Sequence, residues 1–263
     1  MTPSDRTQTQ MSDHRAGDNP KLVSVFTLIF VLLIFGPLGI LGAAINWPQN
    51  LGEDADHNLP LLLDERPSVF WGYFIYLLYS ILFFPVGTMV SGIVASSLPE
   101  GQSHPIHQIG KGFAGLSALT RSIGLSRWLF AMPTLARMYE DPASNEVTRA
   151  AIRVSYELLN KWGGGIGELL GVSMFAALWV FCTSILFILS PTWPSWMGYC
   201  GFLVAIDLAL NLLEMSILGY DMGINLTLAV VFLHAWMFFA VLLFLQCCKC
   251  LSCMRKNESE EEE

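Results

Sequence analysis

Residues 112–136 read GFAGLSALTRSIGLSRWLFAMPTLA, and this stretch decides how many times the chain crosses a membrane. It is long and apolar enough to insert, but Arg121 and Arg127 lie near its middle. A central arginine costs about 2.5–3.5 kcal/mol on insertion scales, so such a helix needs polar partners. The alternative is an amphipathic helix on the cytoplasmic surface. The two arginines lie about 120° apart around a helix and do not form one polar face, which favours a span.

The rest of the chain carries five apolar blocks that are long enough to cross a bilayer, which takes about 20 residues. They are residues 22–45, 69–91, 166–189, 197–218 and 226–246. Only 14% of the 263 residues are charged, against about a quarter in soluble domains. The sequence therefore predicts an all-α, polytopic membrane helix bundle. It has six transmembrane helices, or five if residues 112–136 lie at the interface.

The segments outside the predicted spans are polar or charged. We expect residues 1–21 to be a disordered cytoplasmic N-terminus, because they contain few apolar side chains. Residues 46–67 form an acidic outer loop, residues 143–162 a linker helix, and residues 247–263 a Cys-rich and then acidic cytoplasmic tail. The chain has a net charge of −8, and its sequence contains no basic face. These two features exclude nucleic acid as a partner.

Short motifs in residues 114–210 resemble a known family. They are RSIG at 121–124, NKWGG at 160–164, ALW at 177–179 and PSWMG at 194–198. This stretch is similar to uncharacterised bacterial membrane proteins that carry a domain of unknown function and have six spans. The resemblance implies six helices and no activity. The positive-inside rule instead favours five spans when the N-terminus is cytoplasmic. We follow the resemblance and expect a cell-membrane protein with both termini cytoplasmic.

Polar residues inside predicted spans are costly and therefore mark candidate sites. They are Arg121, Arg127, Asp207, Asn211, Glu214 and His234. Asp207, Asn211 and Glu214 share one helical face. One interpretation is an ion-paired clamp, in which Asp207 or Glu214 neutralises a buried arginine and holds the third and fifth predicted spans together. The other is a polar cavity that binds a small anion, a proton or a lipid headgroup.

Three glycines at four-residue spacing begin the fourth predicted span. Gly163, Gly167 and Gly171 form a row of small residues on one helical face, against which another helix can approach closely. The row predicts tight packing within the chain, with a dimer face as the alternative. Glu168 is one residue away from the row and is interpreted either as an interfacial carboxylate or as a catalytic one.

Four cysteines directly follow the last predicted span. They are Cys247, Cys248, Cys250 and Cys253. Beside basic residues they suggest palmitoylation in a eukaryotic host, with reduced thiols or a soft metal as the alternatives. A compact run of this kind is a poor zinc site, so we predict no metal and no cofactor.

The sequence contains no nucleophile elbow, P-loop, zinc-protease motif or dinucleotide fingerprint, so we predict no enzymatic activity. The first functional hypothesis is a structural or accessory membrane protein. The second is a transporter or binding protein for a small solute, an ion or a lipid headgroup, which uses the intramembrane charges. The third is a lipid-modifying enzyme with Glu168, Asp207, Glu214 and His234 as acid–base groups. The expected partners are the lipid bilayer and either a second copy of the chain or another membrane protein.

Overall fold

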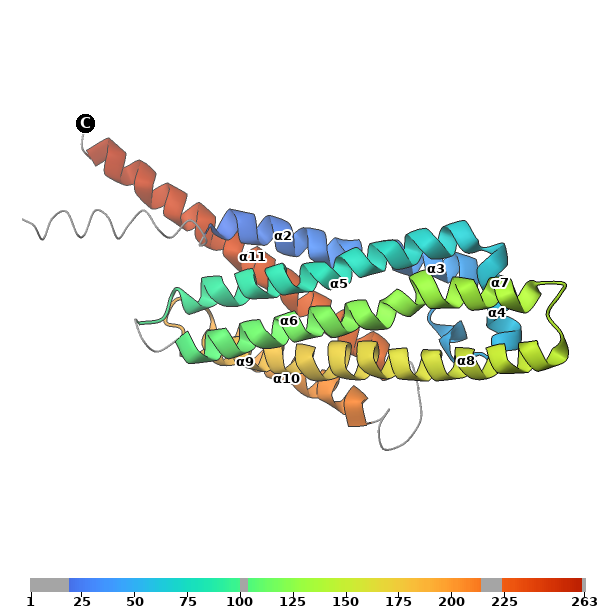
Figure 1. The fold of residues 1–263 in the computed structure, drawn as a ribbon. Helices are drawn as coiled ribbons and strands as arrows, with labels where there is room; N and C mark the ends of the chain where they lie inside the picture. The colour runs from blue at the N-terminus through green and yellow to red at the C-terminus, as the bar shows by residue number, and fades with distance from the viewer. Residues whose placement is uncertain (1–18, 100–103, 214–223, 262–263) are drawn as a thin grey trace, which may run out of the picture.

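The computed structural model describes residues 19–99, 104–213 and 224–261, and within this part every regular element is a helix (Figure 1). The elements are α2 (Pro20–Leu33), α3 (Phe35–Ile45), the 3-10 segment η1 (Gln49–Gly52), α4 (Ala55–Asp64), α5 (Arg66–Ala95), α6 (His104–Ser126), the π-helical segment η2 (Arg127–Ala131), α7 (Met132–Glu140), α8 (Glu146–Gly164), the π-helical segment η3 (Gly165–Phe175), α9 (Ala176–Leu189), α10 (Ser195–Leu213) and α11 (Ile224–Glu261). The predicted all-α bundle is therefore confirmed. The N-terminal segment 1–18 and Glu214 lie outside the described residues.

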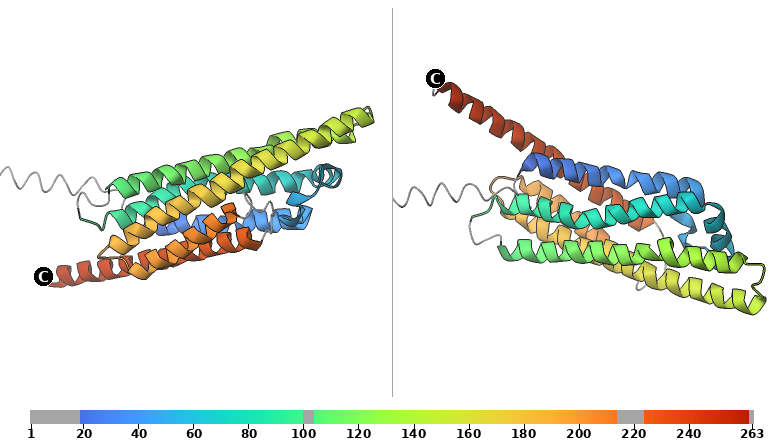
Figure 2. Two further views of the ribbon diagram at one scale, coloured as in Figure 1. Left: turned by 90° about the horizontal axis from the view of Figure 1, so that it is seen from below. Right: turned by 45° about the horizontal axis from the view of Figure 1, so that its top comes forward.

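Several elements join end to end into long rods that run side by side. One rod consists of α6, η2 and α7, and a second consists of α8, η3 and α9 (Figure 2). The first rod packs against α5 on one side and against η3 and α9 on the other. On the remaining side of the bundle, α11 packs against α2 and α10. The start of α2 and the end of α11 lie at the same end of the bundle (Figure 1).

Five helices of the described chain are long and apolar enough to cross a membrane. They cover Pro20–Ile45, Arg66–Ala95, Glu146–Leu189, Ser195–Leu212 and Leu228–Gln246. The first three of these helices contain the predicted blocks 22–45, 69–91 and 166–189, and the fifth covers all but the first two residues of the block 226–246. The block 197–218, which includes Glu214, extends beyond the described part. The rod of α6, η2 and α7 is not among them, because its arginines lower its mean hydropathy. The chain is thus an all-helical protein with five candidate membrane-spanning helices.

The acidic segment after α3 is not an open loop. It folds into η1 and α4, and α4 packs against α7 and α8. The Asp56 carboxylate accepts hydrogen bonds from Arg153 Nε at 2.6 Å and from the Tyr139 hydroxyl. The Arg153 guanidinium and then Tyr139 hold the pKa of Asp56 below its usual range. Asn58, which is buried, donates to the Tyr156 hydroxyl at 2.6 Å and so ties α4 to α8.

Candidate functional site

Polar side chains gather inside the bundle where α5, α6, η2 and η3 meet. We call four of them the arginine cluster: Arg121, Arg127, Asn160 and Glu168. Both arginines are buried, with 4% of Arg121 and 8% of Arg127 exposed. Since an arginine remains charged in proteins, the cluster brings two positive charges into the interior.

Arg127 lies at the start of η2 and is surrounded by polar partners. Its Nη2 atom is 3.6 Å from Glu168 Oε1 and 3.5 Å from Asn160 Oδ1. Its Nη1 atom donates to the backbone carbonyl of Gly124 at 3.0 Å. Asn160 in turn donates to the carbonyl of Leu51 at 2.9 Å. The ion pair is therefore connected through Asn160 to η1, in the folded segment after α3.

Arg121 has fewer partners than Arg127. Its Nε atom donates to the carbonyl of Gly171 at 3.4 Å, and its guanidinium carbon is 4.4 Å from the centre of the Phe83 ring. Its buried Nη2 atom has no hydrogen-bond partner among the described residues. In the same part of the chain, no carboxylate lies within ion-pair distance of Arg121. The contact with Phe83 is a cation–π interaction, which compensates only part of the lost hydration of the guanidinium.

The glycine row leaves room for the arginine side chains. A Cβ atom at Gly163 would lie 2.6 Å from Arg127 Cδ, and one at Gly171 would lie 2.8 Å from Arg121 Cγ. At Gly167 the two helices meet backbone to backbone, because a Cβ on the facing Gly124 would lie 2.6 Å from the Gly167 Cα atom. The row therefore packs against α6 and η2 within the chain.

Two π-helical segments, η2 and η3, carry the residues of the ion pair. Arg127 lies in η2 and Glu168 in η3. The η3 carbonyl of Gly171 accepts hydrogen bonds from two α6 side chains, Ser117 at 2.6 Å and Arg121. Segments of π-helix are rare and occur frequently at functional sites. The π-helical backbone and the buried charges therefore both indicate the arginine cluster as the candidate site.

The prediction was that Asp207 or Glu214 neutralises a buried arginine. Asp207 does not do so among the described residues, and Glu214 lies outside them, so its role stays a prediction. Glu168 takes that position beside Arg127, and the buried Oδ2 atom of Asp207 has no partner in the part of the chain that the structure describes. The reason is helix packing: η3 lies directly against α6, whereas α10, which carries Asp207, packs against α9, η3 and α11. The sequence signal for Glu168 was its place beside the glycine row.

Two other predicted site residues connect different helices. Asn211 of α10 donates to the Ser173 hydroxyl of η3 at 2.5 Å. His234 of α11 lies 2.6 Å from the carbonyl of Val230 through Nδ1 and 3.0 Å from the Tyr79 hydroxyl through Nε2. A carbonyl oxygen can only accept, so Nδ1 carries a proton, and in the neutral imidazole the Tyr79 hydroxyl donates to Nε2.

The four C-terminal cysteines lie on α11, and their side chains are outside the described part of the structure. Among the side chains it describes, no group of three His, Cys, Asp or Glu residues is arranged to hold a metal ion. Palmitoylation of the cysteines stays a prediction.

Comparison of the chain with models of protein families, with curated proteins and with solved structures found no match. The resemblance of residues 114–210 to six-span bacterial membrane proteins therefore stays a prediction.

Proposed function

We propose that this chain is a six-span membrane protein that binds a small anion at the arginine cluster. The observation that carries the proposal is the Arg121 guanidinium, which is 4% exposed and has an Nη2 atom without a hydrogen-bond partner among the described residues. Among the described residues, the one carboxylate within ion-pair distance of either guanidinium is Glu168, and it pairs with Arg127. Arg121 therefore has no counterion within ion-pair distance in the part of the chain that the structure describes.

The chemistry of a guanidinium indicates the class of the ligand. Burying a charge without a partner is costly, so a bound anion would stabilise the site. The planar fork of an arginine matches the two oxygens of a carboxylate or a phosphate. Arg127 Nε and the Tyr73 hydroxyl are further buried groups without a hydrogen-bond partner in the described structure. We therefore propose a carboxylate or phosphate group as the ligand.

Three features support a sixth crossing by the rod of α6, η2 and α7. Its segments have 23, 5 and 9 residues, and a crossing takes about 20. The two ends of the described chain also lie at the same end of the bundle, which fits an even number of crossings (Figure 1). The cluster supplies polar partners for one of the two central arginines, Arg127, and the proposed anion would supply them for Arg121. That the termini are cytoplasmic and the host is the cell membrane remains part of this proposal.

Cysteine accessibility tests the number of spans. In a background that lacks other cysteines, Glu53→Cys and the native Cys250 are each labelled in intact cells with a membrane-impermeant maleimide. Six spans put five crossings between these positions, so we expect one to react in intact cells and the other only after permeabilisation. Equal accessibility of both would mean an even number of crossings and would contradict the sixth span. The comparison does not depend on which side the N-terminus occupies.

Thermal unfolding of the detergent-solubilised protein tests anion binding, with inorganic phosphate and acetate as probes at constant ionic strength. A ligand at 100 times its Kd stabilises a protein by about 2.7 kcal/mol, so one of these anions is expected to raise Tm. Arg121→Met is expected to abolish the shift. The matched control is Arg153→Met, which removes a half-buried arginine of the α4–α8 contact and should keep the shift. A shift of equal size in Arg121→Met, or none in the unmodified protein, would overturn the proposal.

A structural role is the second candidate, and the contact between Gly124 and Gly167 favours it. In this case the arginines only hold α6 against η3. Arg121→Met would then change the stability in the absence of any anion, and neither phosphate nor acetate would shift the Tm of the unmodified protein.

A further inference from the structure

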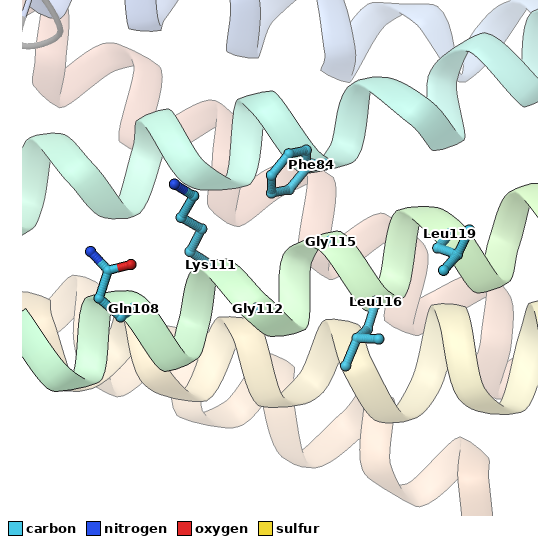
Figure 3. A pocket seen from close by; sticks show the side chains of 7 residues that line it. All are labelled: Phe84, Gln108, Lys111, Gly112, Gly115, Leu116 and Leu119. Carbon is cyan, nitrogen blue, oxygen red and sulfur yellow. The ribbon is translucent and has the colours of Figure 1, made fainter.

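A groove of about 460 Å³ lies on the outside of the bundle between α5 and α6. Phe84 of α5 lines one side, and Figure 3 shows Lys111, Gly112 and Gly115 of α6 opposite it. Gly112 opens the groove, because a Cβ added there would meet nothing within 4 Å. The groove is separate from the arginine cluster, as none of its lining residues belongs to that cluster.

The lining changes from polar to apolar along α6. Gln108 and Lys111 lie toward the start of the helix, and Leu116 and Leu119 lie further along it. Lys111 follows His104 by seven residues, which places it about 10 Å from the start of the helix at 1.5 Å per residue. A lysine at that depth can extend its ammonium group to the headgroup region. The Lys111 side chain reaches across toward α5 (Figure 3).

We propose that this groove binds one anionic phospholipid. The lipid phosphate contacts Lys111 and Gln108, and one acyl chain lies over Gly112 and Gly115 against Phe84. The charge of Lys111 and the apolar floor beyond it together match a molecule with a negative head and an apolar tail. The inference rests on the proposal that α6 crosses the bilayer, but it does not require an anion at Arg121.

Native mass spectrometry tests lipid binding in this groove. The protein is first re-equilibrated with equal amounts of phosphatidylglycerol and phosphatidylcholine. We expect the unmodified protein to retain phosphatidylglycerol preferentially. Lys111→Gln should lower this preference by about tenfold, as loss of one charge-assisted contact would. Gly112→Leu should reduce retention of the bound lipid by filling the groove, without a clash that would unfold the protein.

Matched variants elsewhere on the chain distinguish binding in the groove from non-specific lipid binding. Lys161→Gln removes an exposed lysine of α8, and Gly39→Leu enlarges a glycine of α3 that also faces open space. Both should retain lipid as the unmodified protein does. The groove would be ruled out as the binding site if Lys111→Gln and Lys161→Gln lost the preference for phosphatidylglycerol equally. Unchanged lipid retention in Gly112→Leu would rule it out as well. The cysteine-labelling experiment reports separately whether α6 crosses the membrane. A negative result for lipid binding in the groove can therefore be distinguished from a negative result for the sixth span.

Discussion

Glu168→Gln is expected to lower the free energy of unfolding by about 3 kcal/mol, because it removes the carboxylate beside a buried guanidinium. Arg127 Nη2 lies 3.6 Å from Glu168 Oε1, and the side chains are 8% and 24% exposed. The amide keeps the shape of the carboxylate but not its charge. The effect can be measured by unfolding the purified protein in mixed micelles of a mild detergent and sodium dodecyl sulfate.

A double-mutant cycle separates the ion pair from other effects of the substitution. Arg127→Met combined with Glu168→Gln should cost at least about 1 kcal/mol less than the sum of the single variants, because the second change removes the charge left unpaired by the first. The exposed pair of Lys161 and Glu157, 3.7 Å apart on α8, serves as a control. An exposed ion pair four residues apart on a helix contributes about 0.3–0.5 kcal/mol to the free energy of unfolding. Additive costs at Arg127 and Glu168 would contradict a buried ion pair.

Gly124→Ala is expected to destabilise the protein by about 2 kcal/mol, because it forces two closely packed helices apart. Its Cβ atom would lie 2.6 Å from the Gly167 Cα atom and 2.8 Å from the Gly163 carbonyl oxygen. These are backbone atoms, so no side chain can move aside to relieve the contact. The loss should appear as a lower midpoint in the same mixed-micelle titration.

Gly165→Ala is the matched control, since a Cβ atom at this η3 glycine would meet nothing within 4 Å. Alanine is more favourable than glycine inside a helix by up to about 1 kcal/mol, so this variant should be as stable as the unmodified protein or more stable. The two substitutions therefore differ in sign. A stabilising effect of Gly124→Ala would show that α6 and η3 do not meet at this point.

The helical class of the chain could be predicted from the sequence because it depends on local composition. A backbone inside a bilayer must satisfy its hydrogen bonds internally, so long apolar blocks become helices wherever their neighbours lie. The close contact at Gly167 was also predictable, since spacing along one helix shows which small residues share a face. The segment 46–67 was harder to predict: its charges indicated a loop, yet contacts with α7 and α8 stabilise α4 there.

The partners of the buried polar groups were decided by helix packing. Spacing placed Asp207 and Asn211 on one face of a helix, but it did not show which neighbour that face would meet. The structure turns Asn211 toward Ser173 and leaves Glu168 beside Arg127. An ion pair requires its atoms to lie within about 4 Å, and such a distance depends on which helices are neighbours and how each is rotated. That information comes from long-range contacts, which no local pattern in the sequence contains.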